Sequence, residues 1–232
     1  MQRITEPELM NEPGQAVAYA NADFEAPHRR VIELFRRTFP DWPGTGRVLD
    51  LGCGPGDIAM RFARAYPECM IDGIDGAAAM LDVGRDILKK DPSLAACVNL
   101  LEIMLPHQRP PHDQYDAVIS NSLLHHLHDP CVLWNAVAEF AKPDAPVFII
   151  DLMRPDSPTE AQRLTDLYTV GAPDVLRRDF HASLFASFTP SEVAEQLQSI
   201  PALRHLQVSA ISDRHLMVWG TLLCPIKPPS LT

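Results

Sequence analysis

The sequence predicts an α/β fold with a doubly wound, mostly parallel sheet, and three observations support this prediction. Residues 48–57 read V-L-D-L-G-C-G-P-G-D, a buried strand that ends in a glycine turn and opens an amphipathic helix. Strand-like and helix-like segments then alternate as far as residue 150, as they do in a doubly wound sheet. Two further strand-like segments, 206–210 and 215–222, predict an antiparallel hairpin, which a dinucleotide-binding dehydrogenase does not need.

The spacing of the glycines in the first turn discriminates between nucleotides. A dinucleotide fingerprint is G-x-G-x-x-G, whereas these glycines stand at alternate positions after an acid. The decapeptide resembles the first motif of class I S-adenosylmethionine-dependent methyltransferases, whose typical form is V-L-D-L-G-C-G-x-G. The resemblance covers nearly the whole chain and implies a seven-stranded sheet and S-adenosylmethionine as cofactor. It places the following residues around the methionyl end of the cofactor, with Asp57 also expected to cap the helix: Asp50, Gly52, Cys53, Gly54, Gly56 and Asp57.

The segment before this strand, 1–44, is expected to form a helical lid. Its first residues are polar, an alanine-rich stretch surrounds Tyr19, and a helix with an apolar stripe runs from Pro27 to about Phe39. In the family that the chain resembles, such segments often fold over the cofactor. Tyr19 and Phe24 are then candidates to contact it, Tyr19 by cation–π attraction to the sulfonium or by a hydrogen bond to the carboxylate. Simple packing of the lid is the alternative for both.

The second strand, 70–75, ends in Asp75, where a carboxylate can accept hydrogen bonds from both ribose hydroxyls. Residues 75–81 resemble the second methyltransferase motif, D-x-S-x-x-M-L, with Ala78 in place of the serine. The resemblance implies that Asp75 and Gly76 hold the ribose and that Met80 forms part of the adenine wall. A helix cap at Asp75 and a core position for Met80 are the alternatives.

The third strand, 98–101, is followed by a departure from the family. Relatives usually continue with Gly-Asp-Ala, whose acid binds the adenine amino group, but this chain has Glu102, Ile103 and Met104. The adenine contact is therefore expected from backbone groups near Ile103 and Met104, or from Glu102.

The fourth strand leads into N-S-L-L-H-H-L-H-D-P at 121–130, which resembles the fourth motif of small-molecule methyltransferases, S-x-x-L-H-H-L-x-D-P. Its place at the end of a central strand implies Asn121 and Ser122 beside the transferable methyl group. His125, and after it His126, are predicted to position or deprotonate the acceptor, because imidazole titrates near neutrality. Histidines satisfied by backbone carbonyls are the alternative. A metal site is not expected, because this spacing does not converge on one helix face and no acid stands at ligand spacing.

The fifth strand, 146–150, leads to Asp151, which is predicted to face the acceptor pocket with His125. A divalent ion held by Asn121 and Asp151 is not expected, since the catechol-type branch has a fuller set of acidic ligands. An insertion at about 155–188 interrupts the alternation with two helix-like segments and is expected to cover the acceptor. The catalytic domain as a whole is predicted to span 45–232.

Composition bounds the class of partner. The 232 residues carry a formal charge of −10, which disfavours nonspecific nucleic-acid binding. Arg29, Arg30, Arg36 and Arg37 share one helix face, and a solvated face is expected there, with an anionic acceptor as the alternative. Five cysteines without C-x-x-C spacing predict neither a disulfide framework nor a zinc knuckle. With no leader-like or membrane-spanning segment, the prediction is a cytoplasmic monomer or homodimer without a membrane partner.

The sequence thus predicts an S-adenosylmethionine-dependent methyltransferase that acts on a small-molecule acceptor through an O, N, C or S atom. A nucleic-acid methyltransferase of the tRNA type and a nicotinamide-dependent oxidoreductase are the alternatives, together with a binding protein that has lost its acceptor chemistry.

Overall fold

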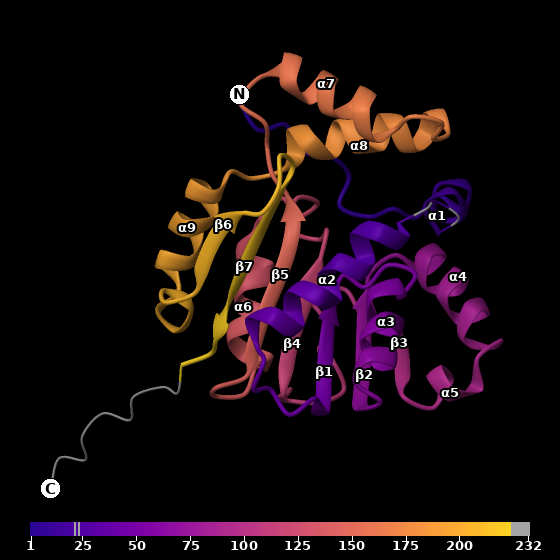
Figure 1. Cartoon of the computed structure of the whole chain (residues 1–232), viewed down its shortest axis with the longest axis vertical. Coiled ribbons are helices and arrows are strands. Elements are labelled where there is room, and N and C mark those ends of the chain that lie inside the picture. The colour runs from indigo at the N-terminus through magenta and orange to yellow at the C-terminus, as the bar shows by residue number, and fades with distance from the viewer. Residues whose placement is uncertain (21, 23, 224–232) are drawn as a thin grey trace, which may run out of the picture.

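The computed structural model describes residues 1–20, 22 and 24–223, and its centre is one seven-stranded sheet (Figure 1). The strand order is β3-β2-β1-β4-β5-β7-β6. The strands are β1 (Thr45–Leu51), β2 (Glu68–Asp75), β3 (Val98–Glu102), β4 (Ala117–Asn121), β5 (Pro146–Leu152), β6 (Gln207–Ala210) and β7 (His215–Thr221). Cys224 and the end of the predicted catalytic domain, 224–232, lie outside the described residues.

The first five strands run parallel, and the predicted hairpin supplies the two antiparallel pairings of the sheet. β1 pairs with β2 on one side and with β4 on the other, so the chain winds outward in both directions from this pair. Ligands of doubly wound sheets bind at such a switch point, outside the carboxyl ends of the strands. β7 pairs antiparallel with both β5 and β6, which confirms the predicted sheet type.

Helices cover both faces of the sheet and bury two large apolar clusters. They are α1 (Pro13–Ala20), α2 (Glu25–Thr38), α3 (Asp57–Ala65), α4 (Ala78–Leu88), α5 (Pro92–Ala95), α6 (Cys131–Phe140), α7 (Pro158–Tyr168), α8 (Asp174–Ala186) and α9 (Pro190–Ser199). On one face, Phe35 of α2 packs against Phe62 of α3 and Phe148 of β5. On the other, Trp134 of α6 and Val193 of α9 are fully buried. The sheet is therefore tightly packed on both faces, and this packing holds the loops at its carboxyl edge in place.

The segment 1–44 divides between two places. α2 belongs to the helical layer on the sheet, where Val31, Ile32 and Phe35 join the core. α1 instead packs against α4 and α8 above the carboxyl ends of the strands (Figure 1). The insertion at 155–188 folds as α7 and α8, which lie over the same edge. The first part of the predicted lid therefore lies over the switch point, whereas α2 packs on the sheet and contributes His28 to the cavity wall. None of the helices in the described part of the chain combines the length and apolarity that a membrane crossing needs.

Candidate functional site

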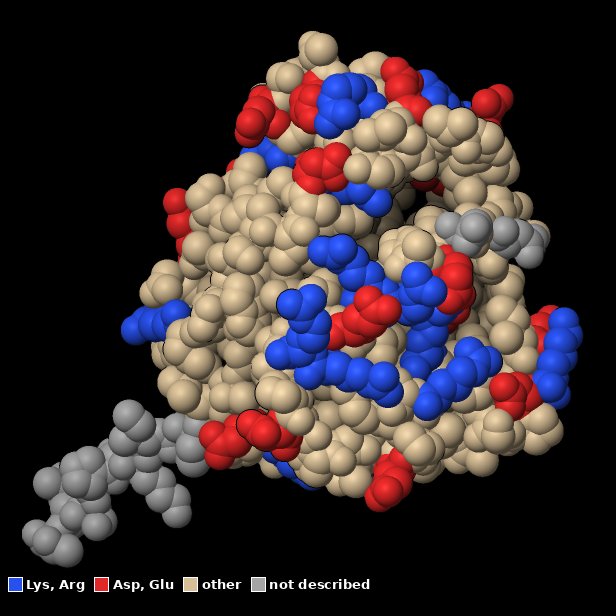
Figure 2. All heavy atoms as spheres, viewed as in Figure 1, with Lys and Arg blue, Asp and Glu red and all other residues tan. Residues whose placement is uncertain are grey.

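A cavity of about 1680 Å³ opens at the carboxyl edge of the sheet, beneath α1 and the insertion, and its mouth is the hollow visible in Figure 2. It brings together nearly all of the predicted site residues. Those that line it are Tyr19, Asp50, Gly52, Cys53, Gly54, Asp57, Asp75, Gly76, Met80, Ile103, Met104, Asn121, Ser122, His125 and His126. Gly56 and Asp151 stand behind the wall, Asp151 buried directly beneath His125.

The three glycines of the turn have different surroundings. Gly52, Gly54 and Gly56 all have positive φ, at 69°, 53° and 80°, which favours glycine. A Cβ on Gly52 would meet Leu123 at 2.7 Å, and one on Gly56 would meet Leu100 at 2.8 Å. Only Gly54 faces open space. Gly52 and Gly56 are therefore needed for packing within the protein, and their approach to the cofactor stays a prediction.

Asp50 is a buried carboxylate with an unsatisfied atom at the cavity. It is 1% exposed, and its Oδ2 has no hydrogen-bond partner among the described residues. Burial, reinforced by the nearby charge of Asp75, raises the pKa of Asp50 to about 8. A buried acceptor of this kind requires a ligand that donates hydrogen bonds or carries positive charge.

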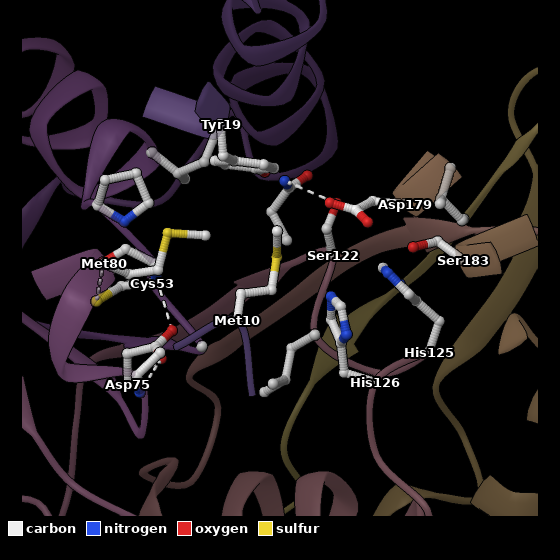
Figure 3. A pocket seen from close by; sticks show the side chains of 18 of the residues that line it. Met10, Tyr19, Cys53, Asp75, Met80, Ser122, His125, His126, Asp179 and Ser183 are labelled. Atoms are coloured by element: carbon white, nitrogen blue, oxygen red, sulfur yellow. Dashed lines mark hydrogen bonds between the residues drawn. The ribbon is translucent and has the colours of Figure 1, made fainter. Parts of the chain in front are cut away.

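Asp75 holds the turn and the start of α4 together (Figure 3). Its Oδ2 accepts the N–H of Gly54 at 2.7 Å, and its Oδ1 accepts the N–H of Ala77 at 2.7 Å. Burial raises the pKa of Asp75, and these N–H groups oppose that shift. Each carboxylate oxygen has a further lone pair that can accept a ribose hydroxyl.

Asp57 departs from its predicted role. It is the first residue of α3 and not its cap, because Gly56 in the left-handed conformation is the N-cap. Its carboxylate lies 2.6 Å from His28 Nδ1 of α2 and accepts Arg61 Nε at 2.7 Å. Burial works against it, but these hydrogen bonds hold the pKa of Asp57 below its ordinary value. Asp57 therefore ties α2 to α3 at the cavity wall, a contact with His28 that no sequence pattern had suggested.

Apolar side chains form the wall near Asp75. Met80 is 3% exposed and packs with Ala16 and Ala77, and Met104 reaches the surface of Gly76. The ring centres of Tyr19 of α1 and Phe24 lie 4.9 Å apart with the rings tilted, and burial raises the pKa of Tyr19 to about 12, so its hydroxyl stays protonated. These residues give the cavity an apolar wall, called here the apolar slot, against which an adenine ring can pack.

His125 and Asp151 form a buried pair on the opposite side of the cavity. His125 Nδ1 lies 2.5 Å from Asp151 Oδ1, and Asp151 Oδ2 accepts the N–H of Leu124 at 2.7 Å. Burial alone would lower the pKa of His125, but the Asp151 carboxylate raises it above its ordinary value. The carboxylate fixes the ring so that Nε2 is the nitrogen left to face the cavity.

Asn121 and Ser122 lie between the cofactor side and this pair. Ser122 has a positive φ of 60°, uncommon for a residue other than glycine, and Asn121 Nδ2 donates to Ser122 Oγ at 3.1 Å. This strained turn directs the chain from β4 into the segment 123–128, called here the histidine loop.

The N-terminal residues 3–8, called here the strap, cross the cavity between the histidine loop and α8. Arg3 donates to the carbonyls of Ala186, His125 and Leu127 at 2.5, 3.1 and 2.8 Å, and its guanidinium lies 3.9 Å from the centre of the Phe188 ring. Glu6 accepts Ser183 Oγ at 3.0 Å and faces both histidines. Sequence reasoning missed Arg3 and Glu6 because nothing local marks them; their partners are more than 100 positions away along the chain.

The cofactor implied by the first motif fits these residues. The unsatisfied Asp50 carboxylate can take the ammonium of a methionyl group, and the open face of Gly54 leaves room for its backbone. Asp75 offers lone pairs for a ribose, and the slot beside it is apolar. All four features lie in one cavity, and S-adenosylmethionine carries a group complementary to each of them.

Comparison with known proteins agrees with this geometry. A family model described as a methyltransferase domain matches residues 49–147. An uncharacterized methyltransferase of Mycobacterium tuberculosis is 24% identical over 156 residues, 67% of this chain and 76% of that protein. The malonyl-[acyl-carrier protein] O-methyltransferase of Halalkalibacterium halodurans is 24% identical over 131 residues, 55% of this chain and 47% of that protein.

Among solved structures, the fold is similar to the plantazolicin methyltransferase BpumL in complex with a monoazolic desmethylPZN analog and SAH. The TM-score is 0.69 with 16% identity, and the match covers 91% of each chain. The chain spans less than half of some of the curated relatives, including 37% of an uncharacterized fission yeast methyltransferase that is 31% identical over 103 residues. From the motifs, the sheet order and these matches, residues 49–147 are a methyltransferase domain, and the chain has the fold of class I methyltransferases.

Proposed function

We propose that this protein transfers a methyl group from S-adenosylmethionine to a small-molecule acceptor bound between the histidine loop and α8. The observation that carries the proposal is one continuous cavity, with Asp50 and Asp75 at one end and the His125–Asp151 pair at the other. The family includes proteins named for malonyl-[acyl-carrier protein], for ubiquinone biosynthesis and for plantazolicin, so small molecules and peptides are both within its range.

The cofactor half of the cavity orients the donor. Asp50 pairs with the ammonium of the methionyl group, Asp75 accepts the ribose hydroxyls, and Met80 with Met104 covers the adenine. Tyr19 of α1 closes this half from above and excludes water. When bound, S-adenosylmethionine supplies an electrophilic methyl group on a sulfonium, and the protein's task is to align the acceptor with it.

The acceptor half of the cavity, lined by the histidine loop and α8, removes the proton that the acceptor loses. Asp151 holds His125 in the tautomer that leaves Nε2 facing the cavity, where it takes the proton that an alcohol, amine or thiol loses on methylation. His126 stays neutral, because burial and the adjacent His125 lower its pKa well below the ordinary value. Asn121 and Ser122 separate donor from acceptor and define the line of transfer.

The test is a methyl-transfer assay that measures S-adenosylhomocysteine with a panel of hydroxyl, amine, thiol and carboxylate acceptors. Wild-type protein should bind S-adenosylmethionine in calorimetry and turn over at least one class. Asp151→Asn should retain cofactor affinity within about twofold and lose about 100-fold or more in turnover, because general-base catalysis contributes on that scale.

His107→Ala serves as the matched control, since His107 also lines the cavity but is exposed and lies away from the pair. It should behave as wild type. Absence of cofactor binding by the wild-type protein would overturn the proposal as a whole. Equal turnover by wild type and Asp151→Asn would overturn the role of the pair alone.

A further inference from the structure

Three potential metal ligands converge at the mouth of the acceptor half of the cavity. Glu6 Oε1 lies 3.7 Å from His125 Nε2 and 3.3 Å from His126 Nδ1, and all three ligand atoms lie within 4.8 Å of one another. The strap brings Glu6 to the histidine loop from the other end of the domain. In Figure 3 the two labelled histidines project from this loop into the same part of the cavity.

The distances resemble those of a tetrahedral zinc site. Zinc binds histidine nitrogen and carboxylate oxygen at about 2.0–2.2 Å, which sets tetrahedral ligand atoms about 3.4 Å apart. The two separations from Glu6 fall close to this value. They are also too long or too poorly aligned for hydrogen bonds, and His126 Nδ1 is buried without a hydrogen-bond partner among the described residues.

Each of the three side chains has a further partner in the protein. Asp151 lies 2.5 Å from His125 Nδ1, Ser183 Oγ donates to Glu6, and the backbone carbonyl of Pro7 contacts the His126 ring. Metal-ligating histidines usually donate their second N–H to a carboxylate or a carbonyl, which orients the ring. Glu6 and Asp151 together also supply the two negative charges that neutralise a divalent ion.

We propose that Glu6, His125 and His126 form a binding site for a zinc-type divalent ion, with a fourth position open to the acceptor cavity. Two histidines and one glutamate with an open position is a ligand set of catalytic zinc sites. An ion there can bind an oxygen or nitrogen of the acceptor directly. The metal site and the proton-accepting role use the same nitrogen, His125 Nε2. His125 therefore binds the ion in the metal-bound protein and accepts the proton in the metal-free protein.

The experiment titrates chelator-treated full-length protein with Zn2+ in calorimetry, without cofactor, and follows the melting temperature in parallel. One ion per chain should bind and raise the melting temperature, since a ligand of the folded state stabilises it. Glu6→Gln and His126→Ala should lose at least about 100-fold in affinity, and Asp151→Asn about 10–100-fold, the effect typical of an outer partner.

His107→Ala and Cys97→Ser are the controls, because a surface histidine or a partly exposed thiol can also bind Zn2+, and both should match wild type. A wild-type protein that binds no Zn2+, or binding that survives Glu6→Gln and His126→Ala unchanged, overturns the proposal. Cofactor affinity is measured on the same samples. Protein that binds S-adenosylmethionine but not Zn2+ overturns only the metal site, whereas the reverse result overturns only the proposed function.

Discussion

Asp50 is buried in an environment that strongly disfavours its charged form. Its pKa is about 8 in the folded protein against 3.8 as the ordinary value. Between these pH values the folded state holds a proton that the unfolded chain has lost. The free energy of unfolding of the ligand-free protein therefore decreases as the pH rises from about 4 to 8, and levels off above.

Asp50→Asn should remove this pH dependence. We expect the variant to melt above wild type at pH 8, by about 2–4 °C for each kcal/mol gained, and the difference to vanish near pH 4. The same variant should bind S-adenosylmethionine more weakly, because it lacks the charge that pairs with the ammonium. Differential scanning calorimetry across this pH range measures the first effect. A variant that melts below wild type at every pH would contradict it.

Asp75 serves structure and ligand with the same carboxylate. Asp75→Ala would leave the N–H groups of Gly54 and Ala77 without their acceptor, at a cost of about 1–3 kcal/mol each where water cannot replace it. We expect a lower melting temperature and at least a tenfold loss of affinity for S-adenosylmethionine. Calorimetry with Asp75→Asn as a second variant should show a smaller loss of stability, because its amide oxygen still accepts one of the two N–H groups while its NH2 group faces the other. Unchanged affinity in Asp75→Ala would contradict the ribose role.

At the scale of elements, the strap is the part of the chain that completes the acceptor half. Arg3 anchors it through three carbonyls and the Phe188 ring. Arg3→Ala should release the strap, because no other residue type offers a planar fork to several carbonyls at once. We expect faster hydrogen exchange in residues 3–8, a higher KM for the acceptor, and cofactor affinity within about twofold of wild type.

Arg3→Lys gives the matched comparison, since it keeps the charge but not the fork, and it should lie between wild type and Arg3→Ala. Equal exchange rates in all three proteins would show that the strap is held by other contacts.

The helices and strands can be predicted from the sequence more reliably than the contacts that their residues make. Alternating patterns predict the strands to within about two residues, and the T-P-S-E sequence predicts the capping box that Thr189 and Glu192 form. Asp57 shows the limit. An acid beside a glycine turn has the composition of a cap, but the left-handed Gly56 takes the cap position and leaves Asp57 to bind His28 of another helix. Contacts between elements carry no local signal.

At the scale of the whole molecule, charge sets the class of partner. The net charge is −10, and the arginines that gather on the face shown in Figure 2 are interleaved with acids. Arg61 pairs with Glu25 at 2.7 Å, Arg29 with Glu33 at 3.5 Å and Arg64 with Asp91 at 3.5 Å. These pairs neutralise part of the positive charge on this face, and the chain as a whole is strongly acidic.

We therefore expect no binding to transfer RNA at physiological salt. An electrophoretic mobility assay at about 1 μM protein should leave the RNA unshifted, because nonspecific binding of even basic proteins is only micromolar or weaker there. A basic nucleic-acid-binding protein run in parallel is the positive control. A shift that persists at this salt concentration would instead favour the alternative of a nucleic-acid methyltransferase.

The cofactor half of the site could be predicted from the sequence and the acceptor half only in part, for a physical reason. Asp50, Gly54 and Asp75 lie on adjacent strand ends, so a motif and a strand pattern are enough to bring them together. Glu6 reaches His125 and His126 only through the docking of the strap, and the histidine loop is not a regular helix. The expectation against a metal site assumed that the histidines lie on a helix and that an acidic ligand would be close to them in the sequence. The histidine loop is not a helix, and Glu6 comes from a distant part of the chain.

The long sequence separation between the strap and its partners on α8 affects the order in which parts of the chain fold. Arg3 and Ala186 are separated by 183 positions, and Glu6 and Ser183 by 177. Closing so long a loop is entropically costly and rewards the chain only late. During synthesis the first residues leave the ribosome long before α8 exists, so the nucleotide-binding half can fold early, whereas the mouth of the acceptor half forms only after α8 has been synthesised.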